Sequence, residues 1–136
     1  MDDASTTAAA AQRREIVATA RALRERSRAL AARYLEARAR FLLHAERHQA
    51  DAPPLWRDAM PHDALPLAAE LHESITAYAS TLRRSGATCE HAVSFAREIA
   101  DDAIAAATER VQLNPQEGRA VAEDLVLWTI DAYLAA

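Results

Sequence analysis

The fold of this chain is decided by residues 5–49, which read STTAAAAQRREIVATARALRERSRALAARYLEARARFLLHAERHQ. No proline and no glycine interrupts this stretch, and most of its residues are alanine, leucine or arginine, which are strong helix formers. We therefore expect one continuous helix of about 45 residues, close to 70 Å long at ~1.5 Å per residue. Pro53 and Pro54 end it, because proline cannot continue a helix.

Apolar side chains recur along residues 5–49 at intervals of three and four residues. This spacing is typical of a helix that packs lengthwise against another helix. The stripe contains small residues as well as large ones, and the small ones predict places where a neighbouring helix can approach closely. One row of the stripe is Ala20, Ser27, Tyr34 and Phe41, and the other is Ile16, Leu23, Leu30, Ala37 and His44.

Three shorter helices are predicted in the rest of the chain, at about 63–85, 88–111 and 115–134. Gly86 stands where a helix C-cap is expected, and Thr88 can cap the helix that follows. The last helix starts at the sequence Asn-Pro-Gln-Glu, in which Asn114 is the cap and Glu117 is predicted to return a reciprocal capping bond.

The predicted fold is all-α, a four-helix-bundle-like domain covering residues 1–136. Residues 1–5 are expected to form a disordered tail, and residues 51–62 a loop anchored by Trp56 and Met60. The three shorter helices are each about 30 Å long, so only the second half of the long helix can complete the bundle. Its first half has no partner within the chain, and an isolated helix of this kind is only marginally stable in water. We therefore expect association with another chain, and self-association in particular.

Charge divides the chain into two parts. All 16 basic residues are arginine, and the net charge is −4. Residues 12–47 hold ten arginines and four glutamates, a net of +6, whereas residues 48–136 hold six arginines and fourteen acidic residues, a net of −8. The remaining −2 comes from Asp2 and Asp3. The long helix is thus basic and the rest of the chain acidic.

Four arginines follow one another at intervals of seven along one edge of the apolar stripe, and Arg24 and Arg38 line the other edge. One interpretation is a row of ion pairs to the acidic residues Glu117, Asp124 and Asp131, which are also seven apart. The alternative is binding of nucleic-acid phosphates. The acidic isoelectric point of about 5.7 and the lack of a helix-turn-helix or aromatic RNA-binding pattern argue against the alternative. We call the four residues the arginine ladder: Arg26, Arg33, Arg40 and Arg47.

Arginine on both edges of the stripe also limits how two copies can pair. A symmetric two-helix coiled coil through this stripe would place arginine against arginine, whether the helices run parallel or antiparallel. A dimer that brings acidic helices against the basic helix is therefore expected instead.

Histidine and cysteine supply weak candidates for chemistry. His44 and His48 lie four residues apart on one helical face, as two metal ligands would, but they lack the glutamate of a zinc-protease helix. No histidine has glutamate three positions before it, which excludes the di-iron bundle pattern. Cys89 is the only cysteine, so no internal disulfide can form, and its place in a first helical turn would favour a thiolate. We predict no metal and no cofactor.

The C-terminal helix is apolar on almost every side. Leu125, Trp128 and Ala132 have the spacing of core residues. Val126, Leu127, Ile130 and Leu134 cover the remaining faces, so part of this helix, with Trp128, is expected to contribute to an interface. No stretch is apolar enough to span a membrane and no signal peptide is evident, so a cytoplasmic location without a membrane partner is expected.

The segment from Leu82, LRRSG followed by a helix, a short loop and DLVLWTIDAY, resembles the C-terminal half of small uncharacterised bacterial helical proteins. The resemblance covers residues 82–136 and implies a bacterial helical module with no assigned activity.

The sequence thus predicts a non-enzymatic interaction or regulatory module that self-associates through the long helix. A nucleic-acid-associated protein and a small-molecule or metal-binding bundle are the alternatives. The residues predicted to take part in the interaction are Ile16, Leu23, Arg26, Leu30, Arg33, Arg40, Arg47 and Trp128.

Overall fold

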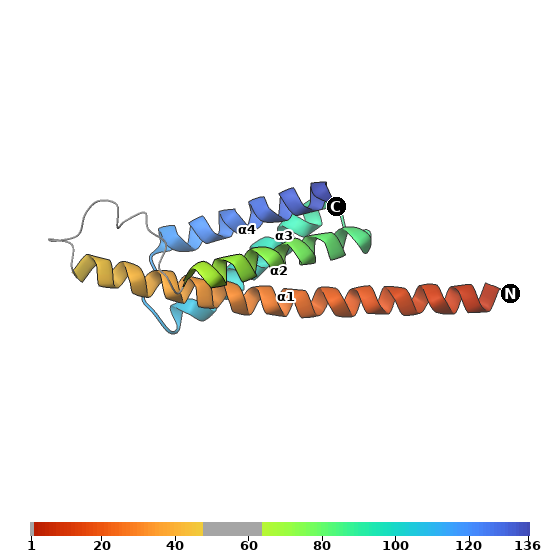
Figure 1. Ribbon diagram of the computed structural model, residues 1–136, viewed down its shortest axis with the longest axis horizontal. Coiled ribbons are helices and arrows are strands. Elements are labelled where there is room, and N and C mark those ends of the chain that lie inside the picture. Colours follow the sequence, from red (N-terminus) through yellow and green to blue (C-terminus); the bar gives the residue numbers. More distant parts are fainter. Residues whose placement is uncertain (1, 48–63) are drawn as a thin grey trace.

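The computed structural model describes residues 2–47 and 64–136 and, among side chains, those of residues 4–42 and 64–136. These residues form four α-helices: α1 (Asp2–Arg47), α2 (Ala64–Arg84), α3 (Cys89–Thr108) and α4 (Pro115–Ala135) (Figure 1). No strand occurs in the described ranges. The predicted all-α, four-helix architecture is confirmed.

The helices pack as a four-cornered bundle in which each helix runs antiparallel to the next in sequence (Figure 1). α1 and α4 each pack mainly on α2 and α3. The pairs α1–α4 and α2–α3 have far fewer contacts, and so lie across the two diagonals. Helix α1 is thus flanked by α2 on one side and by α3 on the other, and α4 is its most distant neighbour.

The ends of α1 differ from the prediction in one respect. The helix begins at Asp2 rather than near residue 5, so the expected N-terminal tail is largely helical. The predicted loop 51–62, with Trp56 and Met60, lies outside the described residues, as does His48.

The core is built from all four helices, and α1 contributes to it only in its second half. The fully buried large side chains include Tyr34 and Leu35 of α1, Leu71 and Ile75 of α2, Ile99 of α3, and Val121 and Leu125 of α4. In α1 the first buried residue is Ser27. In α2, Leu71, Ile75, Tyr78 and Leu82 are all buried. Of the core positions predicted in the last helix, Leu125 and Ala132 are buried, whereas Trp128 is half-buried.

Helix ends follow the predicted capping residues, with one exception. Gly86 has φ of 92°, and its N–H and that of Ala87 donate to Arg83 and Leu82, both at 3.1 Å, which is the Schellman pattern. Asn114 Oδ1 accepts the N–H of Gln116 at 2.9 Å. The reciprocal bond predicted for Glu117 is wrong. Its carboxylate pairs with Arg38 instead, because α1 supplies a charged partner that local sequence does not reveal.

One polar pair is buried between α1 and α2. The hydroxyls of Ser27 and Ser74 share a hydrogen bond of 2.7 Å, and both residues are almost fully buried. Each hydroxyl is the other's partner, so neither is left unsatisfied.

Replacing Ser27→Ala should lower the free energy of unfolding by about 1–2 kcal/mol, because Ser74 would keep a buried hydroxyl without a side-chain partner. The double variant Ser27→Ala/Ser74→Ala should recover much of that loss. Chemical denaturation of the two single variants and the double variant measures this. If the double variant lost as much free energy of unfolding as the two single variants together, the Ser27–Ser74 hydrogen bond would contribute nothing.

Candidate interaction surfaces

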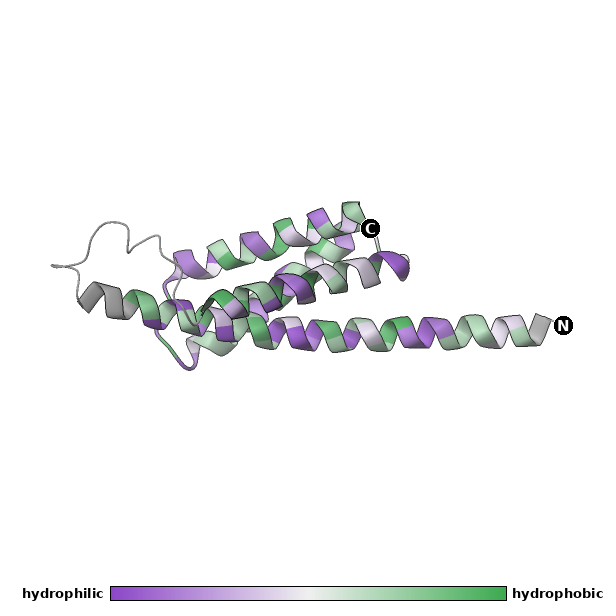
Figure 2. Ribbon diagram, in the orientation of Figure 1, coloured by the Kyte–Doolittle hydropathy of each residue, from purple (hydrophilic) through white to green (hydrophobic). Residues whose placement is uncertain are grey.

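The first part of α1 projects beyond the other three helices (Figure 1). Of residues 4–19, only Ala10 and Ile16 are half-buried, and all the others are exposed. Val17 leaves 53% of its surface in solvent although it is a branched apolar residue. Hydrophilic and hydrophobic residues both occur along this segment (Figure 2), and its charged residues are the consecutive Arg13, Arg14 and Glu15. We call residues 4–19 the arm.

The arm meets the rest of the chain only where it leaves the bundle. A polar notch of about 550 Å³ lies there between the arm and the end of α2. It is lined by Gln12, Glu15, Ile16, Thr19 and Arg84. Ile16, a predicted interaction residue, therefore sits at the base of the arm, beside α2.

Two predicted interaction residues belong to the bundle instead. Leu30 is 5% exposed and is part of the core, and Leu23 is half-buried and packs against that core. The apolar stripe that the sequence shows along α1 is continuous, but between Leu23 and Phe41 its residues are buried or half-buried against the chain's own helices. These two leucines are therefore corrected from interaction residues to packing residues.

The two arginine edges of α1 have different surroundings. Arg24 pairs with Glu98 of α3 at 2.9 Å, and Arg38 pairs with Glu117 of α4 at 2.6 Å. Arg26, Arg33 and Arg40 of the ladder are exposed, and no ion pair joins them to any described residue. The side chains of Arg47 and His44 lie outside the described set.

The predicted match between the ladder and the acidic row of α4 is therefore wrong for Arg26, Arg33 and Arg40. The reason is the order of helices around the bundle, which places α4 diagonally opposite α1. Only the edge containing Arg24 and Arg38 turns toward acidic neighbours, and the ladder faces away from them.

Arg38 is the centre of a partly buried polar cluster. Its Nε donates to Glu117 and its Nη1 donates to the hydroxyl of Tyr34 at 3.0 Å. Burial alone would lower the pKa of Arg38, but its bonds to Glu117 and Tyr34 outweigh that effect and raise the pKa. Nearby, burial raises the pKa of Asp124, Arg38 opposes that shift, and Glu123 adds to it. The cluster ties α1 to the start of α4 across the diagonal.

Asp124 should make the fold less stable at neutral pH than an uncharged residue would, because its raised pKa means that the folded state favours the neutral acid. Asp124→Asn should therefore raise the free energy of unfolding at pH 7. That advantage should shrink as the pH falls through the raised pKa toward 3.8, the value of a free aspartate. Denaturation across this pH range measures it, with Asp131→Asn at an exposed position of α4 as the control. An advantage independent of pH would contradict this account.

The outer face of α4 exposes leucines rather than Trp128. The Trp128 ring is half-buried and meets His72 of α2 edge-on, with ring centroids 5.0 Å apart. Leu127 and Leu134, seven residues apart, are 57% and 70% exposed. Of the α4 residues that the sequence analysis singled out for an interface, Leu127 and Leu134 are therefore more exposed than Trp128.

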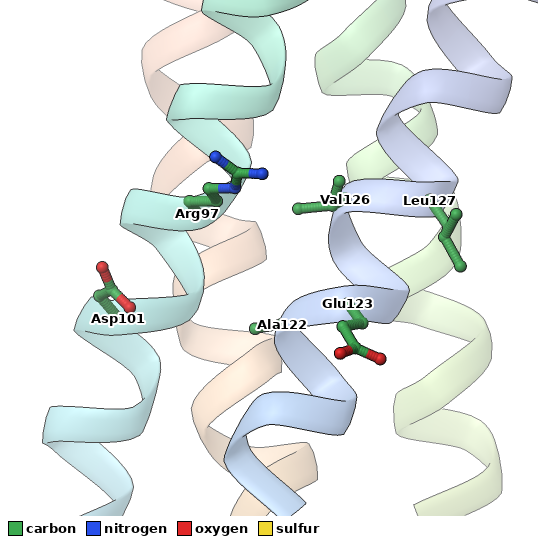
Figure 3. Close-up of a pocket in the computed structure, with 6 residues that line it drawn as sticks. All are labelled: Arg97, Asp101, Ala122, Glu123, Val126 and Leu127. Carbon is green, nitrogen blue, oxygen red and sulfur yellow. The ribbon is translucent and has the colours of Figure 1, made fainter.

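A groove runs beside this face, between α3 and α4. It has a volume of about 490 Å³, and Ala122, Val126 and Leu127 of α4 supply its apolar part. Arg97 and Asp101 of α3 and Glu123 of α4 form its charged rim (Figure 3). Sequence analysis missed this groove, because it depends on which helices are neighbours.

Among the side chains that the structure describes, no group of three His, Cys, Asp or Glu residues could hold a metal ion. None of the described helices is long and apolar enough to cross a membrane. Comparison of the chain with protein-family models, with curated proteins and with solved structures finds no match.

Proposed function

We propose that this chain is a non-enzymatic helical interaction module that self-associates through the arm of α1. The observation that supports the proposal is the exposure of the arm, where Val17 and most of its neighbours are left uncovered by the other described helices. A helix of this composition is marginal by itself, so contact with another surface would stabilise it. The module acts by binding, without catalysis.

A second copy is favoured as the partner because of how charge is distributed over the fold. Among described side chains, the exposed arginines of α1 outnumber its exposed glutamates, whereas most exposed charged residues of α3 and α4 are acidic. Two copies therefore attract each other when α1 of one approaches the acidic helices of the other. Two α1 helices side by side would repel.

Val17→Asp should abolish self-association without unfolding the bundle, because Val17 lies outside the core and is largely exposed. Light scattering over a concentration series should show wild-type mass rising above one chain, 14.9 kDa, and the variant remaining at that mass. Ala22→Asp adds the same charge at another exposed position of α1 and is the matched control. Wild-type protein that stays at the mass of one chain throughout would refute self-association.

Phosphate binding by the arginine ladder is a second candidate, and a specific observation favours it. Arg26, Arg33 and Arg40 are exposed and make no ion pair within the described residues, so they are available to an anionic partner. Their seven-residue spacing separates them by about 10.5 Å along the helix axis. The acidic surface of the remaining helices opposes this function.

Binding to mixed-sequence duplex DNA at low salt separates the two candidates. If the chain acts only as a self-associating interaction module, it should not bind the DNA. Affinity that falls steeply with salt and is lost in Arg26→Glu/Arg33→Glu/Arg40→Glu would instead establish the second candidate. These three positions are exposed and lack ion pairs among the described residues. The free energy of unfolding of the triple variant should therefore lie within about 0.5 kcal/mol of the wild-type value.

A further inference from the structure

Two exposed ridges on opposite corners of the bundle carry matching patterns. The first, which we call the donor ridge, consists of Arg13, Val17 and Arg21 on α1. The second, the acceptor ridge, consists of Glu123, Leu127 and Asp131 on α4. All six residues are exposed, including the two apolar ones, Val17 at 53% and Leu127 at 57%.

The ridges have the same spacing and opposite charge. Each has an apolar residue flanked by charged residues four positions away on either side, and residues four apart lie on one helical face. The donor ridge is basic, apolar, basic, and the acceptor ridge is acidic, apolar, acidic. Because both patterns are symmetric about their centre, Val17 can face Leu127 with both charge pairs matched whichever way the helices run.

The charged residues of the two ridges meet no opposite charge among the described residues, since no ion pair there involves Arg13, Arg21, Glu123 or Asp131. Arg13 donates only to the carbonyl of Ala9 in its own helix, at 3.5 Å. The helices that carry the ridges lie across a diagonal of the bundle. The two ridges therefore cannot meet in one chain without dismantling the fold.

We propose that the acceptor ridge of one copy binds the donor ridge of a second copy, an inference that rests on the proposed self-association. The contact is head-to-tail, because it joins two different surfaces. Each added copy therefore leaves one donor ridge and one acceptor ridge open. The apolar side of the α3–α4 groove, Ala122 and Val126, lies next to Leu127 and extends the surface that the arm covers.

Charge selects this pairing over contact between two arms. Two donor ridges side by side would bring Arg13 and Arg21 of both copies together, and Glu15 is the only acidic residue among described side chains of the arm. The donor ridge against α4 places the same two arginines beside Glu123 and Asp131. Each ridge spans nine residues and rises only about 12 Å, so the contact is small and its population should depend on concentration.

Mixing two inactivated variants tests the head-to-tail arrangement. Val17→Asp removes the donor ridge and Leu127→Asp the acceptor ridge, so each variant alone should associate at least tenfold more weakly than wild type. The mixture retains one intact donor and one intact acceptor. It should form a 1:1 dimer and stop there, as measured by light scattering. A mixture that remains at the mass of one chain would overturn the proposal.

A charge exchange within one chain gives a second readout. Arg13→Glu/Arg21→Glu should weaken association at least tenfold, and adding Glu123→Arg/Asp131→Arg in the same chain should restore it. At a concentration low enough for wild type to be a single chain, helical content and thermal midpoint should match wild type in all variants, because association no longer contributes to stability there. If Leu127→Asp associates like wild type while Val17→Asp does not, the arm has another acceptor, and the proposed function stands without this inference. If wild type never associates, both the proposed self-association and the proposed contact between the ridges are wrong.

Discussion

The length of α1 is the constraint on which the other features of this protein depend. Its 46 residues rise about 69 Å, whereas the 20 or 21 residues of each other helix rise about 30 Å. A bundle can cover only as much of α1 as its shortest members reach. Burial accordingly begins at Ser27, and the arm before Ala20 stays exposed whatever the packing of the core. The same constraint makes the arm, with Val17, the part of the chain that gains most from a partner.

The order of helices around the bundle decides what the charges do. Helix α3 flanks α1, and Arg24 of α1 therefore pairs with Glu98 of α3. Helix α4 lies on the diagonal, and among the described arginines of α1 only Arg38 pairs with it, at Glu117. The ladder arginines remain exposed on the other edge. The chain thus keeps a basic helix on one corner and an acidic, partly apolar helix on the opposite corner. This polarity within the described fold favours attraction between copies over pairing of like helices.

Much of the fold could be predicted because its signals are local. The absence of proline and glycine in residues 5–49 predicts α1, and Gly86 and Asn114 predict helix ends that the structure confirms. The partner of Glu117 could not be predicted, because local capping competes with an arginine about 80 positions away in the chain. The residues exposed on the surfaces could not be predicted for a similar reason. Which edge of α1 faces outward, and whether Trp128 or Leu127 is exposed, depends on neighbours that periodicity does not specify.

The most direct test of the account is hydrogen exchange of the arm amides as a function of protein concentration. An uncovered helix end opens easily and exchanges fast, whereas a covered one is protected. The account predicts that protection of residues 4–19 rises with concentration, together with protection of α4 around Leu127, while the core amides near Leu71 and Ile75 of α2 do not change. Fast exchange throughout the arm at every concentration would contradict it.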